Sequence, residues 1–293
     1  MLTRETSLEL ELSAPHSHDH VHHGHQNGHK HASKVTRIKT SFSETEVRAH
    51  LEGQDTVICI LTGSDIYLTP LLITAASASG VKLFIPSEYG LDTSNPKIRE
   101  LLPPYQTRYE IQELLKNGGL TWRAIYSGLM LEDALKTDGI LGIDTLWASV
   151  VVFPNAETTA VAISTYDDVA KTIVRVAVAG GGDAKAGNAT YTSSFRVGLE
   201  ELVGVVEKEI DKKLDRYEGD LEGAKKEASE RFRRGFFDGG VALMGRVATW
   251  DREVNAWSGW ENGNKNGERW EEEVKKVARL VRSGKIGGDG CGC

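Results

Sequence analysis

Two groups of polar residues in this 293-residue sequence follow stretches that read as buried β-strands. Thr62 and Gly63 follow the apolar run TVICILT, and Ser87, Glu88 and Tyr89 follow VKLFIP. In an open parallel sheet, ligands bind outside the carboxyl ends of the strands. These five residues are therefore candidates for ligand contact. The alternative is that Ser87 and Glu88 only hold a turn.

Arg108 is the candidate catalytic residue. It stands between Tyr105 and Tyr109 in a stretch with helical spacing. A guanidinium group is effectively always protonated, so Arg108 cannot act as a base near neutral pH. It can hold a carboxylate, a phosphate or a developing oxyanion. The alternative is an arginine on the surface of a helix.

A histidine-rich stretch could bind metal ions. Eight of the nine histidines lie between His16 and His31. Neutral imidazole binds Zn²⁺, Ni²⁺ and Cu²⁺ well. The spacing is repetitive, however, and unlike a closed Cys/His zinc site. We expect adventitious binding of divalent metal and no dedicated metal site. A metal-buffering function through this run is a remote alternative.

Deleting residues 15–31 should leave the stability of the fold almost unchanged. A polar stretch buries little apolar surface, and shortening a long loop changes its closure entropy by under about 1 kcal/mol. The same deletion should abolish retention on an immobilised Ni²⁺ column. Thermal unfolding followed by circular dichroism checks the first expectation. A melting temperature lowered by more than about 8 °C would show that the stretch is packed structure.

The composition narrows the classes of partner. The net charge is −7, so the chain has no general basic surface for nucleic acid or anionic membranes. No stretch approaches the roughly 18–20 apolar residues of a membrane span. Three cysteines make no disulfide framework, and Cys59 reads as a buried core residue. We expect a reducing location, in the cytoplasm or the nucleus.

The spacing of apolar residues predicts a parallel α/β sheet. Strands are expected at 56–62 and 81–86, with a helix at 69–79 between them, which makes a βαβ unit. Ser43 with Glu46 predicts the capped start of an earlier helix. The alternation continues with helices at 106–117 and from a Thr165–Asp168 cap to 179, and with strands at 121–126, 148–153 and 160–164.

The chain is expected to divide into four parts. From about Ser194 it becomes mainly helical and highly charged, and we interpret its tryptophans at 250, 257, 260 and 270 as packing residues. The parts are an N-terminal segment with the histidine run (1–34), an α/β core (35–193), a smaller C-terminal lobe for a substrate or partner (194–282) and a disordered tail (283–293).

The segment FIPSEYGLDTSNP, at 84–96, resembles the P-S-E-[FY]-G signature of the NmrA-like and isoflavone-reductase-like family. Segments 51–61, 117–135 and 159–178 resemble other landmarks of the family in the same order. The resemblance implies a doubly wound Rossmann core that binds NADP(H), with the smaller lobe closing over a small aromatic substrate. Some members are reductases, whereas others bind the dinucleotide as regulators without turnover.

The sequence departs from this family at the phosphate-binding loop. A G-x-x-G-x-x-G turn between a strand and a helix lets backbone N–H groups approach the pyrophosphate. No such turn follows any predicted strand, because the glycines at 180–187 follow a helix. MLTRETS resembles the family's second strand, which implies that Arg4, with Thr3 beside it, contacts the 2′-phosphate of NADP.

Two expectations follow from these departures. The core should lack its first strand, glycine loop and first helix, leaving an exposed sheet edge and weak NADP(H) binding. A start codon assigned too far downstream would account for that. Arg108 occupies the position of the family's lysine, to which proton transfer or substrate polarisation is assigned. An impaired reductase, a dinucleotide-sensing regulator and a protein-binding pseudoenzyme all remain open.

Overall fold

The computed structural model describes residues 8–13, 35–136, 139–181, 188–260 and 269–285. Thr3, Arg4, the histidine run and the C-terminal tail lie outside these ranges, and so do the glycines at 182–187. Within them, no helix has both the length and the apolar character needed to cross a bilayer.

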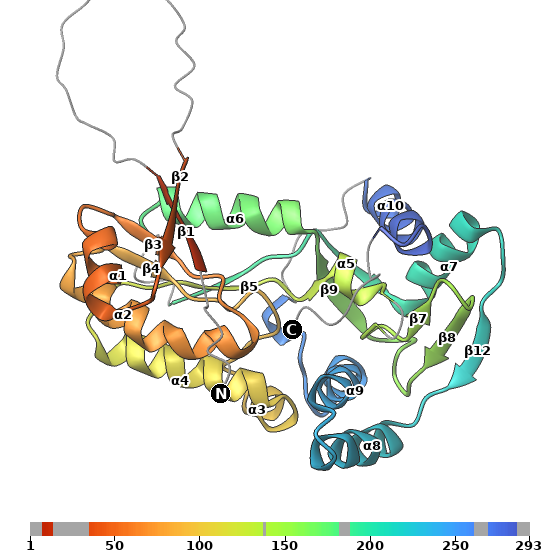
Figure 1. The fold of residues 1–293 in the computed structure, drawn as a ribbon. Coiled ribbons are helices and arrows are strands. Elements are labelled where there is room, and N and C mark those ends of the chain that lie inside the picture. The colour runs from red at the N-terminus through yellow and green to blue at the C-terminus, as the bar shows by residue number, and fades with distance from the viewer. Residues whose placement is uncertain (1–7, 14–34, 137–138, 182–187, 261–268, 286–293) are drawn as a thin grey trace, which may run out of the picture.

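A parallel sheet forms the core, as the βαβ pattern predicts. Strand β3 (Thr56–Ile58) pairs in parallel with β4 (Leu83–Ile85), and β5 (Ala124–Tyr126) pairs in parallel with β10 (Ala189–Tyr191). A parallel bridge between Phe84 and Trp122 joins the two pairs. The strand order β3-β4-β5-β10 therefore confirms the parallel α/β class (Figure 1).

The strands are shorter than the apolar runs that predicted them. The run at 56–62 forms pairs only to Ile58, and the chain then enters the short helix η1 (Gly63–Leu68). At the start of β4, the N–H groups of Lys82 and Leu83 both donate to the carbonyl of Asp55. Beyond Ile58 the apolar run is buried only at Cys59 and Leu61, and Ile60 between them is exposed, so the apolar run extends past the paired residues.

Helices cover both faces of the sheet (Figure 1). Helices α2 (Thr69–Ala78) and α4 (Pro103–Asn117) lie on one face, and α6 (Tyr166–Val178) lies on the other. The edge at β3 is open: within the described residues β3 pairs only with β4, and the side chains of Ile58 and Ile60 are 44% and 70% exposed. An exposed edge of this kind is what the sequence predicted.

The rest of the chain builds two small sheets and a helical lobe (Figure 1). One sheet has the order β11-β9-β6 and the other the order β12-β8-β7. The elements are β6 (Leu129–Met130), β7 (Ile143–Asp144), β8 (Ser149–Val152), β9 (Ala160–Ser164), β11 (Phe195–Gly198), β12 (Asp215–Glu218), α1 (Glu44–Leu51), α3 (Pro96–Leu101), α5 (Leu131–Ala134), α7 (Leu199–Ile210), α8 (Leu221–Arg233), α9 (Phe237–Trp250), η3 (Ser258–Trp260) and α10 (Trp270–Arg282).

The two predicted helix caps have different outcomes. Thr165 caps α6 as predicted, because its Oγ1 accepts from the N–H of Asp168 at 3.2 Å. The predicted helix start is confirmed, because Ser43 is the residue before α1, but the capping box with Glu46 is wrong since the Ser43 side chain makes no capping hydrogen bond. The Glu46 carboxylate instead accepts from the backbone N–H of Ser41 at 2.9 Å. The positive φ of 58° at Phe42 turns Ser41 toward the helix.

A hairpin that the sequence analysis did not predict precedes the core. Strand β1 (Leu8–Ser13) pairs antiparallel with β2 (Val35–Thr40), from Leu8 opposite Thr40 to Ser13 opposite Val35. The alternation in LELELS has the two-residue period of a strand. Regular structure therefore begins before residue 35.

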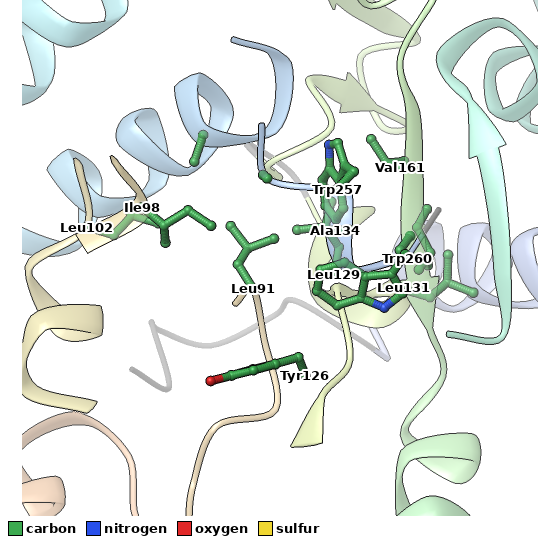
Figure 2. Close-up of a cluster of buried hydrophobic side chains, with 14 of the residues drawn as sticks. Leu91, Ile98, Leu102, Tyr126, Leu129, Leu131, Ala134, Val161, Trp257 and Trp260 are labelled. Atoms are coloured by element: carbon green, nitrogen blue, oxygen red, sulfur yellow. The ribbon is translucent and has the colours of Figure 1, made fainter. Parts of the chain in front are cut away.

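The tryptophans pack as predicted (Figure 2). Trp250, Trp257 and Trp260 are each at most 7% exposed, and Trp270 packs partly buried against the same core, which also contains Cys59. In Figure 2 the indoles of Trp257 and Trp260 lie beside Leu129, Leu131 and Ala134. These aromatic residues join the lobe to the α/β core.

Candidate functional site

The carboxyl ends of β3 and β4 meet at one edge, as expected for parallel neighbours. The N–H of Cys59 donates to the carbonyl of Ile85 at 2.8 Å, and the Tyr89 hydroxyl donates to the carbonyl of Cys59 at 3.2 Å. Burial raises the pKa of Tyr89. This tyrosine therefore ties the two strand ends together as a neutral hydrogen-bond donor.

Thr62 and Gly63 lie at the same edge and are exposed. Thr62 is the residue before η1, and Gly63 opens that short helix with a φ of 56°. A left-handed φ favours glycine, so Gly63 allows the chain to turn into η1. Both residues are accessible to a ligand, whereas Ser87 and Glu88 are buried.

The Glu88 carboxyl group points into the protein. One oxygen accepts from the Gln112 amide at 2.7 Å, and the other takes a short hydrogen bond from the Thr93 hydroxyl. Burial raises the pKa of this carboxyl, while the charge of Arg108 and these two hydrogen bonds oppose the rise. The geometry thus favours the alternative in which the Glu88 side chain holds the turn.

Arg108 reaches the same turn from α4. Its Nη1 donates to the carbonyl of Glu88 at 3.1 Å, and its guanidinium carbon lies 4.8 Å from the ring centroid of Tyr105. The Tyr105 hydroxyl accepts from the N–H of Leu91 at 3.1 Å. Tyr109, the other flanking tyrosine, stacks with Arg99 instead. Of the sequence candidates, Arg108 and Ser87–Tyr89 are therefore brought together.

Three aromatic side chains, Tyr126, Tyr191 and Trp260, are in contact along a line from this turn toward the lobe. Tyr126 accepts a hydrogen bond from the Gln112 amide at 2.9 Å, and its ring lies 5.3 Å from that of Tyr191. Tyr191 donates to the Asp92 carboxylate at 2.6 Å and meets Trp260 edge-on at 5.0 Å. Burial raises the pKa of both tyrosines. Both are therefore neutral phenols, of which Tyr126 is buried and Tyr191 is 38% exposed.

The segment after the P-S-E-Y-G motif carries the contact with the lobe. Asn95 donates from its amide to the carbonyl of Val254 at 2.8 Å, and Lys97 donates to the carbonyl of Glu253 at 2.6 Å. The motif and the lobe are thus positioned together by hydrogen bonds between residues more than 150 positions apart.

Sequence reasoning missed Gln112, Thr93 and the Asp92–Tyr191 pair. Gln112 stands four residues after Arg108, and therefore on the same side of α4, among the buried residues Ile111 and Leu115. An amide within the apolar stripe of a helix is a signal that could have identified it. No local signal connects Asp92 with Tyr191, because 99 positions separate them.

Three surface hollows lie away from these residues. One of about 650 Å³ is lined by residues such as Arg231, Phe236 and Phe237 where α8 meets α9. Two of about 450 Å³ lie beside Phe153 and between α2 and α4. None of the three is lined by the candidate residues. In the described part of the chain, no cluster of His, Cys, Asp and Glu could hold a metal ion.

The profile of the NmrA-like family matches residues 4–236. This protein belongs to the NmrA-like family. Among curated relatives, the oxidoreductase aprR of Aspergillus flavus is 41% identical over 106 residues, covering 35% of this chain and 36% of the relative. The oxidoreductase poxI of Penicillium oxalicum is 30% identical over 121 residues, covering 40% and 38%. The alignments therefore span little more than a third of the length of these relatives.

Solved structures share the fold of this NmrA-like chain. A ternary complex of leucoanthocyanidin reductase from Vitis vinifera has a TM-score of 0.62 at 15% identity, covering 83% of both chains. AtPrR2 with NADP+ and (+)-pinoresinol has a TM-score of 0.62 at 17% identity, covering 81% and 80%. An isoflavone reductase has a TM-score of 0.59 at 15% identity, covering 82% and 79%. At these identities, the likeness shows the Rossmann-type fold alone.

Proposed function

We propose that this NmrA-like protein is an NADP(H)-binding protein derived from reductases of isoflavone-reductase type, which transfer a hydride to a small aromatic substrate. One observation carries the proposal: at the carboxyl edge of a parallel sheet, Tyr89 reaches from the turn after β4 to the end of β3, and Arg108 reaches the same turn from α4. The NADP+ complex of AtPrR2 and the names of the aprR and poxI relatives support it.

The described residues fit only one end of a dinucleotide. Thr62 and Gly63 are exposed beside Tyr89, where they can contact ribose and nicotinamide. Between β3 and α2 there is a single glycine, Gly63, instead of a glycine-rich turn at a helix N-terminus. The pyrophosphate would therefore lack its cradle of backbone N–H groups, and no described residue replaces it. A bound nicotinamide would supply the hydride.

The role of Arg108 in such a site is electrostatic. Its guanidinium cannot exchange a proton near neutral pH, so it can neither activate nor protonate a substrate as a lysine would. It can stabilise negative charge at the edge where its Nη1 meets the Glu88 carbonyl. This difference favours a second candidate function: a regulator that senses the dinucleotide without turnover.

We expect this chain to bind NADPH more weakly than about 100 µM. Without the N–H cradle the pyrophosphate loses several charge-assisted hydrogen bonds, each contributing about 1.5–3 kcal/mol. Titration calorimetry measures the affinity, and a low-micromolar dissociation constant would contradict the prediction.

A second measurement separates the two candidate functions. NADPH oxidation is followed at millimolar cofactor with a panel of aromatic acceptors, and a reaction without acceptor serves as the control. Acceptor-dependent oxidation supports the reductase. Binding of NADPH without any acceptor-dependent oxidation supports the regulator.

A further inference from the structure

Arg108 has no ionic partner among the described residues. Arg216, Arg231 and Arg233 each pair with a carboxylate at 2.6–2.9 Å, as surface arginines commonly do. Arg108 instead meets one carbonyl oxygen and one tyrosine ring, and its Nε is buried without a hydrogen-bond partner in this part of the chain. A partly buried guanidinium with unused donors is costly unless something else satisfies it.

Glu88, the nearest carboxyl on the turn, does not neutralise Arg108. Its two oxygens are occupied by Gln112 and Thr93, and only its backbone carbonyl contacts Arg108. Burial raises the pKa of this carboxyl, which favours its neutral form. The positive charge of Arg108 therefore remains available to a ligand.

Tyr105 supplies a second donor beside Arg108. Because its oxygen accepts from the N–H of Leu91, the hydroxyl proton stays free to bond elsewhere. Gly90 lets the turn pack directly on both side chains: a Cβ there would lie 2.5 Å from the Tyr105 hydroxyl and 3.3 Å from Arg108 Nη1. The two donors are thus held at a fixed place beside the carboxyl end of β4.

We propose that Arg108 and Tyr105 form a binding site for an oxyanion, and that the ligand carrying it is an aromatic carboxylic acid. Guanidinium matches the planar geometry of a carboxylate and also binds phosphate. Tyr191 lies along the same turn, where it is hydrogen-bonded to Asp92. It is 38% exposed and its ring packs on the buried Tyr126 and Trp260, so it offers a surface for an aromatic ring. The assignment of this acid as the substrate rests on the proposed reductase function, whereas the oxyanion site does not.

The test uses trans-cinnamate and its neutral counterpart trans-cinnamamide as probes of the full chain. Affinities are measured by titration calorimetry at pH 7 for the wild type and for Arg108→Gln. We expect Arg108→Gln to weaken cinnamate binding at least tenfold and to leave cinnamamide binding unchanged. Arg108→Lys should weaken cinnamate binding less than Arg108→Gln does, because lysine keeps the positive charge and loses only the bidentate geometry. Tyr105→Phe should weaken cinnamate binding a few-fold.

Arg99→Gln is the matched control. Arg99 also stacks on a tyrosine of α4, at 4.0 Å, but its Nη1 already donates to the carbonyls of Thr93 and Ser94. It should bind cinnamate like the wild type, and near-ultraviolet circular dichroism verifies that each variant is folded. Equal binding of cinnamate and cinnamamide, or equal losses in Arg99→Gln and Arg108→Gln, would overturn the proposal.

Two further measurements complete the test. Binding of inorganic phosphate and NADPH shows whether the oxyanion belongs to the cofactor or to an acid, and NADPH oxidation distinguishes failure of the oxyanion site from failure of the reductase function. If inorganic phosphate and NADPH lose affinity in Arg108→Gln while cinnamate does not, the site belongs to the cofactor and the aromatic acid is rejected. If cinnamate binds through Arg108 but no acid supports NADPH oxidation, the reductase function is rejected and the oxyanion site stands. If neutral acceptors turn over as well as acids, the reductase stands and the acid specificity is rejected.

Discussion

Replacing Trp260 with alanine should lower the free energy of unfolding by about 3–5 kcal/mol. Trp260 is 2% exposed, and its Nε1 donates to the carbonyl of Thr192 at 2.8 Å. Its ring meets Tyr191 and Trp257 at 5.0 and 5.9 Å between centroids. The truncation leaves a cavity between the lobe and the core and removes a hydrogen bond from the partly buried carbonyl of Thr192. Urea denaturation followed by circular dichroism measures the change.

Trp147→Ala is the matched control, because Trp147 is 78% exposed on the turn between β7 and β8. It should change the unfolding free energy by no more than about 0.5 kcal/mol. A loss of less than about 1 kcal/mol in Trp260→Ala would show that this indole does not hold the lobe on the core. A large loss in both variants would show that the effect follows from losing any tryptophan.

Glu88→Gln should remove a pH dependence from the stability of the protein. Burial is the largest cause of the raised pKa of Glu88 in the folded state, relative to its ordinary value of 4.5. Between that value and the folded pKa, the folded state holds a proton that the unfolded state releases. The wild type should therefore lose stability as the pH rises above about 4.5, by up to about 1.4 kcal/mol per pH unit. Below that pH the contribution is constant.

Glutamine keeps the shape and cannot ionise, so it retains a partner for Gln112 and Thr93. The stability of Glu88→Gln relative to the wild type should increase steadily with pH between about 4.5 and the folded pKa. Urea denaturation across this range measures the difference. Parallel pH profiles for the two proteins would show that Glu88 ionises in the folded state at its ordinary pKa.

Glu113→Gln serves as a control of opposite sign on the same helix. A hydrogen bond from Lys116 lowers the pKa of Glu113, so its contribution is lost as the pH falls below its ordinary value of 4.5. Glu113 is well exposed, and solvent screens the effect. This variant should lack the rising difference expected of Glu88→Gln.

The local features and the family could be predicted from the amino-acid sequence. Spacing and residue type within short stretches of the chain predicted the βαβ unit, the Thr165 cap and the buried tryptophans. These features could be predicted because periodicity and caps depend on residues that are close in sequence. The P-S-E-Y-G segment indicated the NmrA-like family, which the profile over residues 4–236 shows. The sequence also placed Arg108 on a helix, whereas its contact with that segment came from the structure.

The directions in which the site residues face became known from the folded structure. Ser87, Glu88 and Tyr89 are consecutive, yet Glu88 turns inward to Gln112 while Tyr89 reaches the end of β3. That outcome depends on where α4 packs on the sheet, and packing joins residues far apart in the chain. The bond between Tyr191 and Asp92 spans 99 positions for the same reason. The residue types identify the side chains that could bind a ligand. Long-range packing determines which of these side chains are free to do so.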